Sequence, residues 1–238
     1  MKYWIRTAVV FGALLAQVAG AEDLFPGGKA AKLARLAEVP SATTMGGYPL
    51  YTGGRNWYLL DNKVESNNMD ARIAYLQLVS PEGDSLFAQM AVVASLSAAT
   101  EEGYFSADLC SPSKSHLFML NKAAGRNDNC LLIDPVEGKI GDKAFTLLHL
   151  KIRNSQSSWR LYDVSMYLSL EKLGFPSTVA GDWTPSAVAA DPRKQKAFDK
   201  IVAWAKQLQD GVNKAIAFSK PQDAFDGVPA IQTLVAAD

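Results

Sequence analysis

The chain is poor in the residues that carry most enzyme chemistry. It has only two histidines and two cysteines in 238 residues. It contains no Gly-x-Ser-x-Gly nucleophile elbow, no phosphate-binding loop and no His-Glu-x-x-His zinc motif. The letters Gly27-Gly28-Lys29 occur without the spacing and the preceding strand that a phosphate loop needs. These absences disfavour the motif-bearing hydrolases, nucleotide-binding enzymes and zinc enzymes, and they predict no cofactor.

The chain also lacks an excess of charge of either sign. Lys plus Arg and Asp plus Glu number 24 each, and residues 1–21 contain Lys2 and Arg6 but no acid. Without those residues, 22 basic side chains stand against 24 acidic ones, a net charge of −2. So weak a charge does not steer a protein toward nucleic-acid phosphates or anionic lipid. We therefore expect no nucleic-acid partner. The apolar share of 48% is enough for a sizeable core.

The first 21 residues have the three parts of a secretory signal. Lys2 and Arg6 make the start positive, residues 7–16 are uncharged and mostly apolar, and Ala19 and Ala21 form a small-x-small site. The apolar run is too short for a spanning helix, which needs about 20 residues. No second apolar run is long enough to span a bilayer. We expect cleavage after Ala21, a periplasmic or secreted protein without a stable membrane span, and a single mature domain over residues 22–238.

The two cysteines, Cys110 and Cys130, are expected to form a disulfide. Export places them in an oxidising compartment, where a structural disulfide is favoured over metal binding. Their spacing is too wide for a CxxC redox pair. The bond would close a loop of about 20 residues and contribute about 3 kcal/mol in the chain-entropy model. Two unpaired buried thiols are the alternative.

Two segments are typical of β-hairpins. Residues 71–79 and 86–94 flank a Pro-x-Gly turn, and residues 144–153 and 159–170 flank a polar loop over residues 154–158. In the second hairpin, alternation places on one face Leu148, Leu150, Ile152, Tyr162, Val164, Met166 and Leu168. The opposite face is polar. This pattern is typical of an antiparallel sheet covered on one side.

The last third of the chain predicts one long amphipathic helix. Asp191 is a good N-cap and Pro192 a good first residue, and apolar residues then recur at steps of three and four as far as Ile216. Trp204 is offset from this stripe, so we expect a partly exposed edge contact, and Gly211 weakens the helix by about 1 kcal/mol. Strands followed by this helix predict an α+β fold, in which the C-terminal helix packs on the antiparallel sheet.

Two shorter segments are less distinctive. Residues 29–37 are rich in alanine and predict two turns of helix, ended by Pro40. Residues 116–120 fit a short helix begun by Ser111-Pro112 and fit a strand equally well.

His149 has a catalytic and a structural interpretation. It falls on the polar face of its predicted strand, across from the strand that holds Asp163. A His–Asp pair can orient a general base, with Ser165 as the nucleophile. The structural alternative, which we favour, is a surface histidine that titrates freely and has a cross-strand partner.

His116 has the same two interpretations. It lies close in sequence to Asp108, Asp128 and Asp134, which could complete a metal site. The spacing of these residues matches no metal motif. A structural histidine is the favoured interpretation here too.

Several features together resemble uncharacterised exported proteins of Gram-negative-type bacteria. They are the cystine loop, the run Leu161–Leu168, the triplet Gly174-Phe175-Pro176 and the Trp-bearing helix around Ala203-Trp204-Ala205. The resemblance implies a location in the cell envelope and no particular activity. The sequence therefore predicts a non-catalytic binding or interaction module, whose partner is an envelope protein or a small molecule. The alternative is an exported hydrolase or metal-dependent enzyme that uses His149 or His116.

Overall fold

The computed structural model describes most of the chain after the expected signal. The described residues are 22–67, 70–83, 85–97, 110–111, 113, 116–122, 127–140, 143–156, 160–176, 179–217, 219 and 222–235. The expected signal over residues 1–21 lies outside them.

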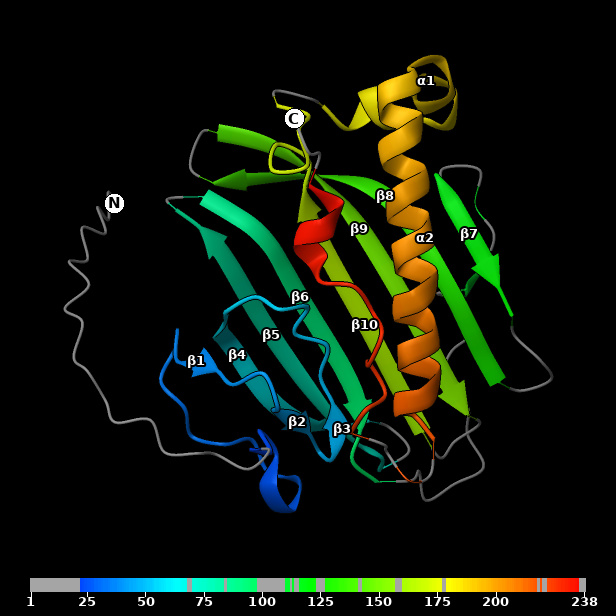
Figure 1. The fold of residues 1–238 in the computed structure, drawn as a ribbon. Helices are drawn as coiled ribbons and strands as arrows, with labels where there is room; N and C mark the ends of the chain where they lie inside the picture. The colour runs from blue at the N-terminus through cyan, green and yellow to red at the C-terminus, as the bar shows by residue number, and fades with distance from the viewer. Residues whose placement is uncertain are drawn as a thin grey trace.

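One antiparallel sheet dominates the fold (Figure 1). It has eight strands in the order β1-β4-β5-β6-β10-β9-β8-β7. Their bounds are β1 (Glu38–Val39), β4 (Trp57–Ser66), β5 (Arg72–Glu82), β6 (Ser85–Ser95), β7 (Phe118–Asn121), β8 (Asn127–Ile140), β9 (Lys143–Gln156) and β10 (Arg160–Ser169). Two short strands, β2 (Thr44–Met45) and β3 (Tyr48–Pro49), form a separate two-stranded sheet.

Both α-helices of the described residues follow the sheet in sequence. They are α1 (Pro185–Ala190) and α2 (Pro192–Ala215), and the shorter 3-10 helices are Pro26–Gly28, Ala180–Trp183 and Ile231–Leu234. The predicted antiparallel sheet with one long C-terminal helix is thus confirmed, while the protein contains far more strand than the label α+β suggests.

Both predicted hairpins are present. Strands β5 and β6 pair directly, with an irregularity between Ser80 and Pro81 that brings Phe87 into the core beside Ala88. Strands β9 and β10 pair from Gln156↔Arg160 onward. The loop between β9 and β10 is therefore shorter than expected, because the polar residues after Arg153 continue β9 as far as Gln156.

The N-terminal segment extends the sheet instead of forming the expected helix over residues 29–37. Its backbone pairs with β4: Leu36 N–H donates to the Leu59 carbonyl, and Leu59 N–H donates to the Ala37 carbonyl. The Asn62 side chain also donates to the Ala31 carbonyl. Hydrogen bonding to the open sheet edge outweighs the helix propensity of its alanines. Of the ambiguous residues 116–120, those from Phe118 onward form a strand, since β7 pairs with β8 from Phe118.

Helix α2 begins as its sequence predicts. The Asp191 carboxylate accepts hydrogen bonds from the backbone N–H groups of Arg193 and Lys194, which caps the first turn. The expected exposure of Trp204 is wrong, because this side chain is only 2% exposed and donates to the Pro229 carbonyl. The C-terminal tail therefore covers an edge of the helix that the apolar stripe leaves open.

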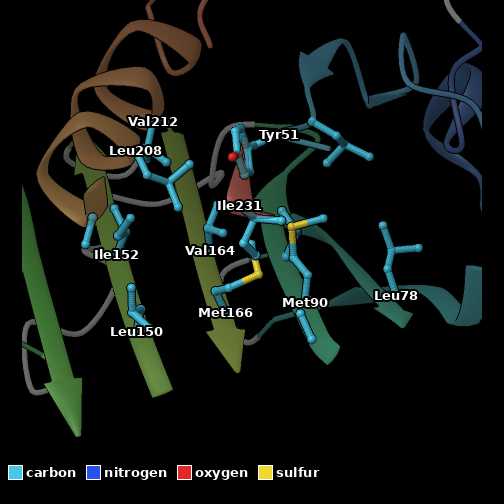
Figure 2. Close-up of a cluster of buried hydrophobic side chains, with 14 of the residues drawn as sticks. Tyr51, Leu78, Met90, Leu150, Ile152, Val164, Met166, Leu208, Val212 and Ile231 are labelled. Carbon is cyan, nitrogen blue, oxygen red and sulfur yellow. The ribbon is translucent and has the colours of Figure 1, made fainter. Parts of the chain in front are cut away.

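The core lies on one face of the sheet, which three segments cover (Figure 1). They are the N-terminal loop, by which we mean the described chain before β4, helix α2, and the C-terminal tail, by which we mean the described chain after α2. Figure 2 shows Leu150 and Ile152 of β9 beside Leu208 and Val212 of α2. In the same view, Ile231 of the tail and Tyr51 of the N-terminal loop lie over the middle strands. We call this covered side the helix face.

Candidate binding site on the polar face of the sheet

The side of the sheet opposite α2 holds all the histidines and acids that the sequence singled out and the structure describes. Because side chains alternate along a strand, the neighbours of the buried Leu148, Leu150 and Ile152 point away from the helix. We call this side the polar face and define it by His149, Lys151 and Arg153 of β9, Asp163, Ser165 and Tyr167 of β10, and Asp128 and Asp134 of β8.

Strand register brings these residues together. On β9, His149 lies opposite Tyr167 of β10 on one side and Asp134 of β8 on the other. Two residues further along β9, Lys151 lies opposite Ser165. Directly opposite residues in antiparallel strands share a face and lie close together. Lys151 therefore occupies the middle of the polar face.

A buried ion-pair network closes one end of this face. Arg153 Nε donates to Asp128 Oδ2 and Arg153 Nη1 donates to Asp163 Oδ2, each at 3.2 Å. Ser155 Oγ donates to the same oxygen of Asp128 at 3.2 Å. These four side chains belong to residues that are only 1–7% exposed. The sequence prediction of a sheet covered on one side is therefore wrong at this end.

The disulfide lies beside the network. Cys110 and Cys130 are bonded, as predicted. Cys130 lies opposite Arg153, so the bond is on the polar face. The Asn121 side chain donates to the Cys110 carbonyl at 3.3 Å, which further ties Cys110 to the sheet. The disulfide and the network together fix the strands at this end of the site.

Asp163 is the acid with the most perturbed titration on this face. Burial raises the pKa of Asp163 to about 7, although Arg153 and Lys151 attract its charged form. Its second oxygen, Oδ1, is buried and has no hydrogen-bond partner among the described residues. Buried polar atoms are nearly always satisfied, so an open acceptor calls for an explanation.

His149 is not the freely titrating surface residue that we expected. Its ring stacks on Tyr167 with 4.4 Å between centroids and an interplanar angle of 3°. Burial, assisted by the charge of Lys151, lowers the pKa of His149 to about 4. The imidazole is therefore neutral near pH 7. Its Nε2 is buried and has no hydrogen-bond partner in the described part of the chain.

Lys151 lies between these two groups. Its side chain is half-buried, and this burial lowers the pKa of Lys151 while the nearby Asp163 opposes the shift. Its ammonium group has neither a hydrogen bond nor an ion pair within the described ranges. Adjacent titratable groups perturbed by burial are characteristic of functional sites.

The structure does not assemble the general-base pair that the sequence suggested. Asp163 lies opposite Arg153, which is four residues from His149 on β9. At about 3.4 Å per residue, this places the two about 14 Å apart along the strand. The carboxylate next to His149 is instead Asp134, which binds His116 Nδ1 at 2.7 Å.

The proposed metal ligands are also only partly brought together. His116 contacts Asp134, whereas Asp128 belongs to the Arg153 network and Asp108 lies outside the described residues. Within the ranges that the structure describes, no three His, Cys, Asp or Glu side chains are grouped so that they could hold a metal ion.

Sequence reasoning missed the central residues of the site. The sequence analysis singled out neither Lys151 and Arg153 of β9 nor Tyr167 of β10. Alternation already placed Lys151 and Arg153 on the same face as His149. Their partners depend on the pairing of β8 with β9, and no turn signal in the sequence identified β8 as a long strand.

Comparison with protein-family models, with curated proteins and with solved structures finds no match to this chain. In the described residues, no helix is both long enough and apolar enough to cross a membrane.

Proposed function

We propose that this protein is an exported, non-catalytic binding protein that takes a small oxyanion, a carboxylate or a phosphate, on the polar face of its sheet. The observation that carries this proposal is the unused hydrogen-bonding capacity of three side chains on one face, with Lys151 lying between the other two. Lys151, His149 and Asp163 share one face, and the described protein leaves the Lys151 ammonium, His149 Nε2 and Asp163 Oδ1 without partners.

The unpaired ammonium group of Lys151 favours an anionic group on the ligand. Lys151 is a half-buried cation without a hydrogen-bonded partner, and a charge-assisted hydrogen bond to an oxyanion satisfies it better than a neutral acceptor does. Neutral His149 can add a second hydrogen bond through Nε2. Arg153 is already held by two aspartates and supports the site without contacting the ligand.

The binding proposal is better supported than the hydrolase. A general base needs a carboxylate or nucleophile within hydrogen-bond reach. Here His149 is separated from Asp163 by the register, and Ser165 lies opposite Lys151 instead.

Nuclear magnetic resonance tests the site directly. The ¹⁵N-labelled mature domain, residues 22–238, is titrated with inorganic phosphate, succinate and citrate. We expect at least one of these anions to shift amide signals of β9 and β10 around Lys151 in a saturable way. Saturable shifts confined to another part of the protein, or none with any of the three anions, would contradict the proposal.

Export is the second part of the proposal. It is supported by the signal pattern of residues 1–21 and by a disulfide, which is typical of oxidising compartments. Mass spectrometry of the protein recovered from cells should find Glu22 as the first residue. Recovery of the chain with its amino terminus intact would contradict export by signal cleavage.

A further inference from the structure

The polar face loses its charges on the strands beyond β10. Cross-strand register continues this face onto β6 and β5. The side chains that it places beside the middle of β10 are all uncharged: Tyr75, Gln77 and Val79 of β5, and Gln89, Ala91 and Val93 of β6. The face of a sheet that meets water normally alternates in polar residues. The apolar members of this set therefore call for an explanation.

Part of this uncharged area is already covered. Ala71, Ile73 and Leu161 form a second hydrophobic cluster, separate from the main core, and each is at most 6% exposed. Tyr75 and Val93 pack against this cluster and are themselves only half-buried. By register, they lie between the cluster and the level of Lys151 on the sheet. Apolar surface is therefore left partly open next to the site.

Lys151 begins a row of side chains that crosses four strands. Lys151 of β9 lies opposite Ser165 of β10. Ser165 in turn lies opposite Ala91 of β6, and Ala91 lies opposite Gln77 of β5. Neighbouring strands are about 4.8 Å apart, so this row runs about 14 Å from Lys151 to Gln77. We call these four residues the cross-strand row.

The middle of the cross-strand row has short side chains. Ser165 and Ala91 are small and half-buried. The side chains two positions away on the same face are all larger: Asp163 and Tyr167 on β10, and Gln89 and Val93 on β6. An extended chain can therefore lie along the row and contact larger side chains on both of its sides.

Charge along the row is confined to its two ends. At one end is Lys151, whose ammonium group has no ion pair in the described part of the chain. At the other end, the exposed Asp61 of β4 lies opposite Gln77. Asp163 flanks the row, but its charge is offset by Arg153 at 3.2 Å. An anionic group is thus favoured at Lys151 and disfavoured at the far end, near Asp61.

From this arrangement we infer that the oxyanion at Lys151 is the head group of a medium-chain carboxylate, whose alkyl chain lies along Ser165 and Ala91 toward Gln77. The inference rests on the proposed function and names its ligand class. A single negative charge matches the single free ammonium group, and the chain removes apolar side chains beside the row from water. The length of the row suits an extended chain of about eight to ten carbons.

Isothermal titration calorimetry of the mature domain with butyrate, hexanoate, octanoate and decanoate tests this inference. A fully buried methylene group strengthens binding about fourfold, and one covered on a single side strengthens it about twofold. We therefore expect octanoate to bind at least about tenfold more tightly than butyrate. In nuclear magnetic resonance spectra, octanoate should shift amide signals of β10, β6 and β5, whereas phosphate, succinate and citrate should shift only those of β9 and β10.

Ala91→Gln places a longer polar side chain in the path of the alkyl chain. It should weaken octanoate binding at least about fivefold and leave the binding of the small anions unchanged. Ala203→Gln is the matched control, because Ala203 is an exposed alanine on α2. It should leave both affinities unchanged. Circular dichroism should show both variants folded, and the amide shifts of the native protein test the path of the chain without any variant.

Three results would overturn the inference. Equal affinities along the carboxylate series, or octanoate shifts confined to β9 and β10, would do so and leave the oxyanion proposal standing. Absence of binding by every anion, small or long, would end both proposals. A dimer in analytical ultracentrifugation that octanoate leaves intact would assign the open apolar side chains to a second copy of the chain.

Discussion

The titration of His149 gives the sharpest physical test of the polar face. Burial lowers its pKa from an ordinary value of 6.5 to about 4. Lowering this pKa from 6.5 to about 4 corresponds to about 3 kcal/mol, because a tenfold change in an equilibrium is worth about 1.4 kcal/mol. The sign follows from linkage: a depressed histidine pKa contributes stability above pH 6.5, and that stability is lost as the pH falls through about 4.

The perturbation is His149→Phe, which keeps a ring on Tyr167 and removes the titrating group. Urea unfolding of both proteins at pH 7 and near pH 4 gives the free energy of unfolding. We expect the native protein to lose more stability than the variant between these pH values, with a difference approaching about 2–3 kcal/mol. Asp163, whose pKa is raised to about 7, changes stability in the opposite direction, but it does so in both proteins.

The imidazole signals give an independent reading of the same quantity. The chain has two histidines, so His116→Gln assigns the two resonances. We expect the His149 signal to remain that of a neutral ring at pH 6 and to titrate near pH 4. A His149 that titrates at about 6.5, together with parallel stability curves for native protein and His149→Phe, would refute the desolvation of this face.

Two further predictions concern the packing of α2 and the disulfide. Gly211→Ala should gain about 1 kcal/mol of helix propensity yet destabilise the protein overall, because the new Cβ would lie 2.4 Å from the Phe225 ring and overpacking costs about 1–3 kcal/mol; a higher melting temperature in differential scanning calorimetry would contradict this. Replacing Cys110 and Cys130 together by serine should lower the free energy of unfolding by about 3 kcal/mol, because the bond spans 20 residues, and an unchanged urea midpoint would show that the disulfide does not stabilise the fold.

The elements best predicted from sequence are those whose information is local. The β9–β10 hairpin follows from the alternation of Leu148, Leu150 and Ile152, and the start of α2 follows from Asp191-Pro192. The disulfide followed from having one possible pair. In each case the pattern that dictates the structure lies within a few residues or depends on cysteine count alone.

The errors occur where distant segments decide the outcome. The alanine-rich residues 29–37 pair with the edge of β4 instead of forming a helix. Trp204 is buried because the tail at Pro229 covers it. These contacts join segments that are far apart in sequence, and neither periodicity nor propensity contains that information.

The candidate site could be predicted only in part, because some of its contacts also join segments that are far apart in sequence. Its residue types on β9 could be read from alternation, but the partners of His149 depend on which strands flank β9 and in which register. The observed register places Asp134 and Tyr167 next to His149, where the sequence analysis expected Asp163. Burial of the polar face, which shifts the pKa values of His149 and Asp163, also depends on tertiary packing.

The central claim is that Lys151 receives an oxyanion, and an affinity comparison tests it most directly. The mature domain is titrated with phosphate, succinate and citrate by calorimetry, in parallel with Lys151→Met and with Lys214→Met. Lys214 is the matched control, since it is an exposed lysine on α2 without an ion pair among the described residues. We predict that the anion that binds the native protein loses at least about tenfold in affinity, about 1.4 kcal/mol, with Lys151→Met and nothing with Lys214→Met. Equal losses in the two variants, or no loss in Lys151→Met, would contradict the account.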